Sequence, residues 1–433
     1  MNRWLFIGAA GLPFVVLAVL VACYAVNVPV MDQWELVALF EKHHLTSVSF
    51  ADFFAQHNEH RLFFPRLVMF GLAEISRWNV MWEMAASLAL AAVTFWLLCK
   101  VLAKTITNQQ WRQIATVLIS IVFFSPMAWE NWLWGWQVQW YLNVLGLVLA
   151  IWALSTWQAV PYKRVLLAAA GAVLATYSLA SGFFVWLVCL PLFWYVKPLR
   201  AWAWVWGGCA LAAVAGHYVG YQDPVNSPSR TLFLHQPVAY VKYIVIYLAH
   251  PLAFASQLVI IIAPLYAVAF GSVLLQLYRH ARQTLTTSLL PWLILGVYAC
   301  LAAASTGVTR LGISVGQAYS SRYTTLSLLL LITFIVLLCK VLESLSGKKS
   351  PTLNGRTKKA AVSILAAVGV LVVLGYGSGA LDMHRHSAYL HKLQHCARTA
   401  SSVHDPCLTT LYPSPGSVWP RLLYLRSIHW GGL

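Results

Sequence analysis

The sequence predicts an all-α polytopic membrane protein with about eleven transmembrane helices and amphipathic helices on the outer face. Of its 433 residues, 60% are hydrophobic and 9% are charged. A soluble domain of this length could not bury so much apolar surface, and many apolar runs reach the length of about 20 residues that a spanning helix needs. The formal net charge of +17 comes from basic residues that lie mostly between these runs, as cytoplasmic membrane anchors do. This charge therefore does not indicate that the protein binds nucleic acid.

The first apolar run extends from Trp4 to about Val28, directly after Asn2 and Arg3. It is longer than the core of a signal peptide and lacks an A-x-A cleavage pattern, so we expect a retained first span. Further runs of similar length follow along the chain. The nine clear spans are expected at 4–26, 81–103, 112–128, 140–159, 201–220, 258–278, 287–305, 324–342 and 360–379.

A further long apolar run, between the basic pairs at 163–164 and 197–200, is broken by SLASG at 178–182. Basic residues at both ends place both ends in the cytoplasm, so this run predicts a hairpin of two short helices. The other basic groups agree with an N-terminus inside and a C-terminus outside. The apolar segment 62–78 would put Lys100 and Lys104 outside if it crossed the membrane, and we therefore expect it to be an amphipathic helix at the outer interface.

This topology places eleven of the twelve carboxylates on the outer side or at its boundary, and leaves Glu343 inside. Seven of the eleven fall between positions 32 and 83. We expect the chain to divide into two parts at residue 380, with a transmembrane domain over 1–380 and an outer tail over 381–433. The first outer loop, 29–80, is therefore the expected position of an outward-facing site.

Asp32 follows the first span and is spaced i, i+3 from Glu35, which puts both carboxylates on one helical face. Later in the same loop, HNEHRLFFPR contains the ionisable residues His57, Glu59, His60, Arg61 and Arg66. A carboxylate that a nearby cation keeps ionised at a partly desolvated interface is suited to act as a general base. We expect this role for Asp32 or Glu59, because ionisable groups at membrane depth are costly and mark functional sites.

Other acids and histidines carry weaker signals. We expect Glu41, Glu74 and Glu83 to belong to a solvated loop that neutralises its own charge. The HNEH stretch lacks firm helical ligand spacing, so a divalent metal is possible there but not indicated. The same holds for the tail histidines, which are His384, His386, His391 and His395.

The second outer loop combines indoles with amides and a carboxylate, in Trp129, Glu130, Trp132 and Gln137. Interfacial tryptophans commonly anchor a protein in the membrane. Flat indole faces beside amides also suit the binding of sugar rings. Both interpretations remain open at this point.

Two cysteines, Cys396 and Cys407, lie in the polar tail, whereas the other six lie in apolar runs. Their separation of eleven residues suits a disulfide in an oxidising compartment, and two free thiols are the alternative. The expected tail is a short outer helix followed by a loop that this disulfide closes.

The order of these features resembles the GT-C superfamily of integral membrane glycosyltransferases, such as the protein O-mannosyltransferases and the aminoarabinose transferases. The family segment close to EHPPL is matched in part by NEHRLFFPRL. VLISIVFFSPMAWENW resembles a third span that ends in Ser-Pro, here Ser125 and Pro126, and SSRYTTLSLLLL resembles the Arg-Tyr that opens a late span, here Arg322 and Tyr323. The resemblance covers about residues 4 to 345 as topology, and implies a GT-C-like fold.

The resemblance also implies an inverting transfer of a sugar from a polyprenyl phosphate to an envelope glycan, lipid or protein acceptor on the outer face. Asp32 matches the position of the catalytic carboxylate, and Glu59 is the second choice for that role or a partner that positions the acceptor. We expect Glu35, His57, His60 and Arg61 to bind substrate or acceptor. The lipid phosphate needs outer cations, for which we expect Arg322 with Tyr323, Arg310 and Arg66.

Two other classes remain as alternatives: a polysaccharide polymerase or ligase, and a transporter or flippase of lipid-linked sugars. Transporters tend to have internal repeats and ionisable residues near mid-membrane, neither of which the sequence displays. The short loops and compact tail favour a bacterial inner membrane, with membrane lipids around the helices. They do not identify the sugar or the acceptor.

Overall fold

The computed structural model describes residues 2–224, 228–253, 256–285, 288–346 and 355–433. Within these ranges the chain is almost wholly helical, and its strands form one two-residue hairpin. The expectation of an all-α membrane protein is confirmed. Eight helices in these ranges are long and apolar enough to cross a membrane.

These eight candidate spans coincide with eight of the eleven expected ones. They are α1 (Arg3–Tyr24), α5 (Met81–Thr105), α6 to α7 (Gln109–Phe123 and Trp129–Leu133, joined by η2, Pro126–Ala128), η3 with α8 (Gly135–Gln137 and Val138–Ser155), α15 (Val259–Leu285), α16 (Leu290–Arg310), η9 with α17 (Ser321–Tyr323 and Thr324–Ser346), and α18 (Gly355–Thr399).

Three shorter helical segments occupy the positions of the other three expected spans. They are α9 (Pro161–Thr176), the segment Ala180–Tyr195 made of η4 (Ala180–Gly182), α10 (Phe183–Val188) and α11 (Leu190–Tyr195), and α12 (Ala203–Tyr218). The expected hairpin is therefore present as two antiparallel helical segments that turn near 178–182. η5 (Lys197–Trp202) joins the second of them to α12.

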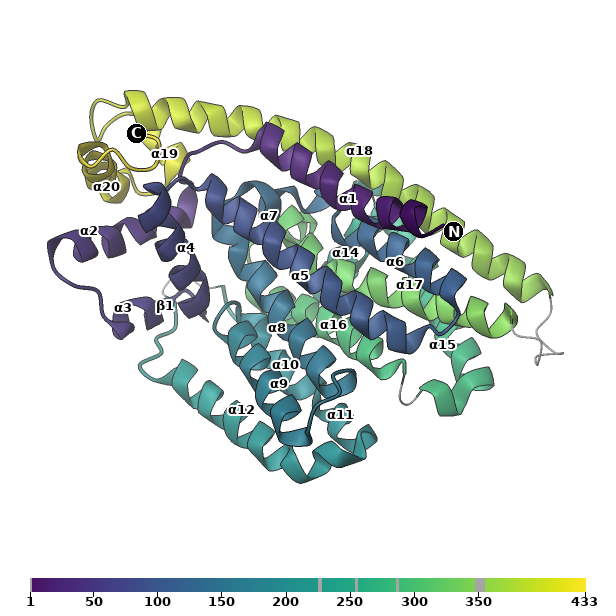
Figure 1. Ribbon diagram of the computed structural model, residues 1–433. Coiled ribbons are helices and arrows are strands. Elements are labelled where there is room, and N and C mark those ends of the chain that lie inside the picture. Colours follow the sequence, from purple (N-terminus) through teal and green to yellow (C-terminus); the bar gives the residue numbers. More distant parts are fainter. Residues whose placement is uncertain (1, 225–227, 254–255, 286–287, 347–354) are drawn as a thin grey trace.

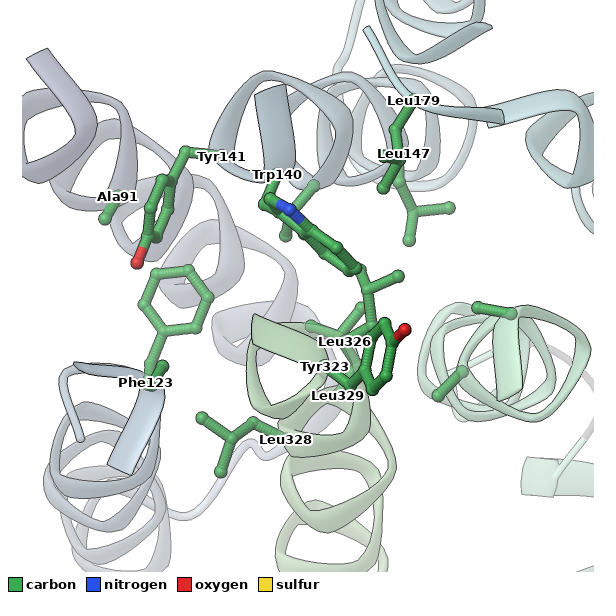
Figure 2. Packing of buried hydrophobic residues seen from close by; sticks show 14 of the residues in the cluster. Ala91, Phe123, Trp140, Tyr141, Leu147, Leu179, Tyr323, Leu326, Leu328 and Leu329 are labelled. Carbon is green, nitrogen blue, oxygen red and sulfur yellow. The ribbon is translucent and has the colours of Figure 1, made fainter. Parts of the chain in front are cut away.

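The helices differ in how much of their surface is buried, from the centre of the bundle to its edge. The apolar window of the span that contains α17 is 94% buried, whereas the corresponding windows of α1 and α15 are each 17% buried. The N-terminal ends of α8 and α17 meet through Trp140 and Tyr323, with Leu326 and Leu329 nearby (Figure 2). α8 crosses α9 where Gly146 faces Gly171, and a Cβ atom built on Gly171 would lie 2.7 Å from the Gly146 carbonyl oxygen. These two glycines allow the backbones to approach closely.

The first outer loop forms a compact layer at one end of the bundle (Figure 1). It comprises η1 (Met31–Leu36), α2 (Val37–Leu45), α3 (Phe50–Phe54), β1 (Gln56–His57), β2 (His60–Arg61) and α4 (Phe63–Ser76). β1 and β2 are antiparallel, with His57 paired with His60. Asn58 takes the left-handed conformation in the turn, with φ of 48°, which asparagine tolerates better than most residues. α4 is the helix expected at 62–78.

The segment between α12 and α17 also supplies shorter elements. They are α13 (Leu232–His235), α14 (Pro237–Ala249), η6 (His250–Leu252), η7 (Ser256–Leu258) and η8 (Val315–Tyr319). Helix α14 packs against α16 and η8.

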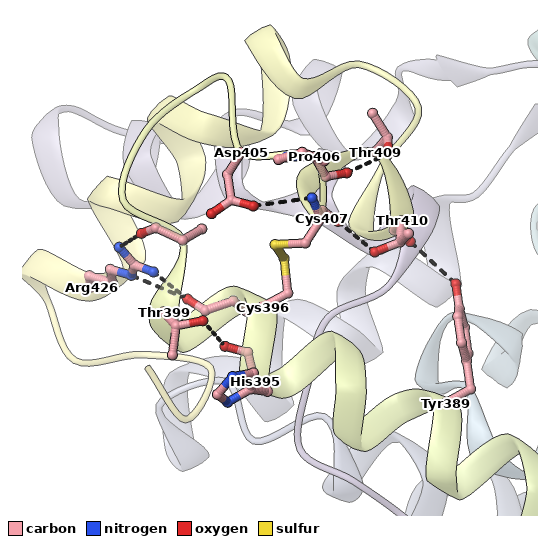
Figure 3. The surroundings of a disulfide bond; sticks show 12 residues. Tyr389, His395, Cys396, Thr399, Asp405, Pro406, Cys407, Thr409, Thr410 and Arg426 are labelled. Atoms are coloured by element: carbon pink, nitrogen blue, oxygen red, sulfur yellow. Dashed lines mark hydrogen bonds between the residues drawn. A yellow bond between two sulfur atoms is a disulfide. The ribbon is translucent and has the colours of Figure 1, made fainter.

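The C-terminal tail differs from the expected short helix and loop. Helix α18 does not end near residue 380 but continues to Thr399, since 380–399 contains neither proline nor glycine to stop it. The tail then folds back through α19 (Leu408–Leu411) and α20 (Pro415–Ser427) and packs on α2. Cys396 and Cys407 form the disulfide that closes the intervening loop (Figure 3).

Candidate active site

A cavity of about 190 Å³ opens where the first outer loop meets the bundle. Eight of the site residues expected from the sequence line it, although they come from five separate segments of the chain. They are Asp32, His57, Glu59, His60, Gln137, Arg310, Arg322 and Tyr323.

Asp32 is held at the cavity by the turn that ends the first span. Helix α1 stops at Tyr24, and the turn η1 begins at Met31. Gln33 fixes this turn, because its Oε1 accepts from the Val30 backbone N–H at 3.2 Å and its Nε2 donates to Glu83 Oε2 at 2.7 Å. The Asp32 side chain remains 38% exposed and can therefore meet a ligand.

Glu83 is buried beneath this turn, so its expected place in a solvated loop was wrong. Its second oxygen, Oε1, accepts from Trp78 Nε1 at 3.0 Å. Only 1% of the residue is exposed. A buried carboxyl is tolerated when both oxygens have donors, and here it ties α5 to η1.

His57 lies between two carboxylates. Its Nδ1 is 3.0 Å from Glu35 Oε2, and its Nε2 is 3.7 Å from Asp32 Oδ2. Burial opposes protonation of this ring, but the two carboxylates outweigh it and raise the pKa of His57 to about 9. Burial likewise disfavours the charged form of Glu35, and the contacts with His57 and with Tyr412 reverse this and lower the pKa of that carboxyl.

Two further hairpin residues, Glu59 and His60, contact segments that come much later in the chain. Glu59 Oε2 is 3.4 Å from an Arg310 guanidinium nitrogen, and the Glu59 side chain is only 13% exposed. His60 Nδ1 accepts a hydrogen bond from the Ala180 backbone N–H at 2.9 Å, in the SLASG break. Burial lowers the pKa of His60 to about 4, which agrees with a neutral ring that accepts at Nδ1.

Arg322 and Tyr323 also line the cavity, from η9 just before α17. Arg322 Nε donates to Ser320 Oγ at 3.0 Å. The ring of Tyr323 stacks on Tyr247 with centroids 5.1 Å apart. Within the described ranges, no carboxylate lies within ion-pair distance of Arg322, whereas Arg310 is paired with Glu59.

Glu130 supports this segment from outside the cavity and does not line it. Its Oε2 accepts from Ser320 Oγ at 2.9 Å, from Ser321 Oγ at 2.7 Å and from the Arg322 backbone N–H at 3.0 Å. Glu130 thus positions the backbone of Arg322. Together with Trp129 it borders a second cavity beside α18.

Three residues expected to bind ligand have structural contacts instead. The Arg61 guanidinium donates to the carbonyl oxygens of residues 54, 217 and 219, and that of Arg66 donates to those of residues 53 and 55. Trp132 is 1% exposed and donates to the Ser125 carbonyl oxygen. Arginine has five donors and readily organises loop carbonyls in this way, so basic character alone did not distinguish these residues from the cavity arginines.

Trp136 and Trp140, from the tryptophan-rich second outer loop whose indoles could stack on sugar rings, form an aromatic wall of the cavity. Three other cavity residues were not expected from the sequence. They are Ser305, Thr306 and Thr309, whose hydroxyls line the cavity from α16. The i, i+4 spacing of Ser305 and Thr309 in an otherwise apolar helix is a signal that could have revealed these hydroxyls. Tyr412, from the tail, does not line the cavity but contacts Glu35, and spacing could not have revealed this contact.

Within the described part of the chain, no group of three or more His, Cys, Asp or Glu side chains is placed to hold a metal ion. This includes the HNEH stretch and the tail histidines. The side chains that line the cavity include carboxylates, guanidinium groups, hydroxyls and aromatic rings. No family model, curated protein or solved structure matches the chain.

Proposed function

We propose that the chain is a membrane glycosyltransferase that moves a sugar from a polyprenyl-phosphate donor to a hydroxyl acceptor on the outer face of the membrane. The observation that carries the proposal is the shared cavity, which the exposed carboxylate of Asp32 lines together with Arg322 and Arg310. A transfer of this kind needs a base at one end of the reacting atoms and cations at the other. The GT-C resemblance supports the same reaction.

In the proposed reaction Asp32 takes the proton of the acceptor hydroxyl as that oxygen attacks the anomeric carbon. The bond from the anomeric carbon to the phosphate oxygen breaks, and its electron pair leaves with the lipid phosphate. A single displacement of this kind inverts the anomeric centre, and its transition state has oxocarbenium character. No metal is needed to balance the step.

Arg322 is the residue best suited to the leaving phosphate. Its guanidinium is free of a carboxylate partner among the described residues, and Glu130 fixes its backbone. Planar guanidinium groups match phosphate oxygens with two parallel hydrogen bonds. Arg310 is partly neutralised by Glu59, so we assign this pair to orienting the sugar or the acceptor.

The aromatic and hydroxyl walls suit a sugar. Trp136 and Trp140 line one side, and Gln137 accepts from Trp140 Nε1 at 2.7 Å, which holds that indole in place. The hydroxyls of Ser305, Thr306 and Thr309 lie on another side of the cavity. Rigid rings beside a few polar groups are typical of carbohydrate sites.

The test is a mass-spectrometric comparison of lipid-linked sugars and envelope glycans from cells with the wild-type chain, a deletion or Asp32→Asn. Asp52→Asn is the matched control, because Asp52 belongs to the same outer loop but pairs with Lys42 at the surface. We expect the deletion and Asp32→Asn to lose the same sugar and to accumulate its polyprenyl-phosphate donor. Normal glycans in Asp32→Asn cells would exclude Asp32 as the base, and a deletion that leaves donor and glycan unchanged would reject the transferase.

A further inference from the structure

The C-terminal tail contacts the proposed catalytic centre directly. Tyr412, which follows α19, donates its hydroxyl to Glu35 Oε1 at 3.1 Å. The other oxygen of Glu35 is 3.0 Å from His57 Nδ1, and His57 Nε2 is 3.7 Å from Asp32 Oδ2. A continuous chain of polar contacts thus runs from the tail to the exposed carboxylate.

We propose that Tyr412, Glu35 and His57 are positioning residues that hold Asp32 toward the cavity, so that the docked tail is a working part of the transferase. This inference rests on the proposed function, because it gives Asp32 the role of base. Neither Glu35 nor Tyr412 lines the cavity. Their effect on transfer therefore passes through His57.

The local backbone explains why Asp32 and Glu35 can share one histidine. They lie on the 3₁₀ helix η1, in which side chains three residues apart stand one above the other. His57 is 7% exposed, so little water can compete with the two carboxylates for contact with its ring. An imidazolium between two carboxylates has one N–H for each, and this fixes the ring and both acids together.

The groups around His57 agree with a cation at this place. Asp32 and Glu35 face it from η1, and His60, from the paired strand, is kept neutral by burial and accepts from the Ala180 N–H. Asn58 Nδ2 lies 3.2 Å from His57 Nε2, and a proton on Nε2 requires this amide to turn so that its oxygen, not its NH2 group, faces the ring. The more distant cations Arg66 and Arg421 act on Glu35, and they leave the two carboxylates as the acidic neighbours of the ring.

The tail is anchored firmly enough to supply this contact. Arg426 donates to the carbonyl oxygens of Ala397 and Ala400, and these bonds brace the loop that the Cys396–Cys407 disulfide closes (Figure 3). Tyr424 Oη lies 2.6 Å from His44 Nδ1 on α2. The tail therefore reaches the first outer loop at two separate tyrosines, of which Tyr412 contacts Glu35 and Tyr424 contacts His44.

These two tyrosines give a matched pair of variants. Tyr412→Phe removes the hydroxyl that contacts Glu35, and Tyr424→Phe makes the same change at the other anchor. We expect Tyr412→Phe to reduce transfer by about tenfold, as for the loss of one hydrogen bond to a charged group, and Tyr424→Phe to leave it unchanged. Transfer is measured in membranes from deletion cells that carry each variant, with the accumulated lipid-linked sugar as donor.

A second readout does not depend on transfer. The ring of His57 is titrated by nuclear magnetic resonance in the purified full chain with isotope-labelled histidine, and its signal is assigned by its loss in His57→Gln. We expect His57 to remain protonated at pH 8 in the wild type and to titrate at lower pH in Glu35→Gln. In Glu35→Gln the upper pH limit of transfer should fall together with the pKa of His57.

The outcomes separate the two proposals. If Tyr412→Phe transfers like Tyr424→Phe, and His57 titrates near its ordinary value, the positioning chain is overturned while an inactive Asp32→Asn leaves the transferase standing. If Asp32→Asn retains full transfer, the role of Asp32 as base is overturned, and the positioning of a base by the tail falls with it.

Discussion

Glu130 offers a sharp test of how the proposed phosphate site is built. One oxygen, Oε2, accepts from Ser320 Oγ, Ser321 Oγ and the Arg322 backbone N–H. Glu130→Ala removes this oxygen altogether. Glu130→Gln can keep an oxygen in the same place but removes its charge, so the two variants separate the acceptor from the charge.

The size of the effect follows from these three contacts. A hydrogen bond to a charged group contributes about 1.5–3 kcal/mol, and one between neutral groups contributes about 0.5–1.5 kcal/mol. The two serine hydroxyls can rotate toward the second cavity. Most of the lost stability therefore comes from the Arg322 backbone N–H, which is left without its acceptor. We expect Glu130→Ala to lower the free energy of unfolding by about 2 kcal/mol and Glu130→Gln by about 1 kcal/mol. We also expect transfer to fall by about tenfold in Glu130→Ala, because the Arg322 segment loses its support.

Stability is measured by thermal unfolding of the purified chain in detergent, and transfer in membranes as above. Asp382→Asn is the control, since Asp382 borders the same second cavity but pairs only with Arg385, of which 67% of the side chain is exposed. The reasoning is refuted if Glu130→Ala unfolds and transfers like Asp382→Asn. It is also refuted if Glu130→Gln is as impaired as Glu130→Ala, because then the acceptor oxygen has no value without the charge.

Three further predictions concern the scaffold. Gly171→Leu should destabilise the chain by about 1–3 kcal/mol through overpacking at the α8–α9 crossing, while Gly207→Leu, which faces open space, should not; thermal unfolding compares the two. Cys407→Ser should cost about 2–3 kcal/mol, because the disulfide closes a loop of eleven residues, and denaturant unfolding with and without reductant measures this. The folded state raises the pKa of His57 from 6.5 to about 9. The stability that protonated His57 contributes is therefore complete below pH 6.5 and is lost as the pH rises through 9. The free energy of unfolding of His57→Gln should depend less on pH over this window.

Much of the architecture could be predicted because apolar run length and basic flanks report directly on spanning helices. The run from Trp4 became α1, and the SLASG break became the turn before α10. The gathering of acids in the first outer loop predicted which part of the chain would meet the cavity. Asp32, Glu59, Arg310 and Arg322 do lie around it, although about 290 residues separate the first of them from the last.

The sequence-based expectations failed for side chains whose role depends on how deeply they are buried and not on their residue type. Glu83 and Glu41 look alike in the sequence, but Glu83 is buried against Gln33 and Trp78. Arg66 and Arg322 differ in the same way, because one binds loop carbonyls and the other lines the cavity. A sequence gives the residue type and spacing, but not which donors will surround a carboxylate after folding. The contact between Tyr412 and Glu35 joins positions 377 residues apart and leaves no local pattern at all.

The charges around the cavity fit the proposed reaction in a further way. The carboxylates of Asp32, Glu35 and Glu59 are balanced by protonated His57 and the two arginines, so the cavity and its supports are close to neutral before the donor binds. A lipid phosphodiester brings one negative charge, and transfer turns it into a monoester with a second one. The proton that Asp32 takes from the acceptor removes one negative charge at the same moment. The negative charge thus moves from the side of His57 to the side of Arg322, and the total charge in the poorly hydrated cavity does not change. Because unbalanced charge in such a place is costly, a carboxylate base that shares the cavity with an arginine is better suited to this transfer than two acids or two cations would be.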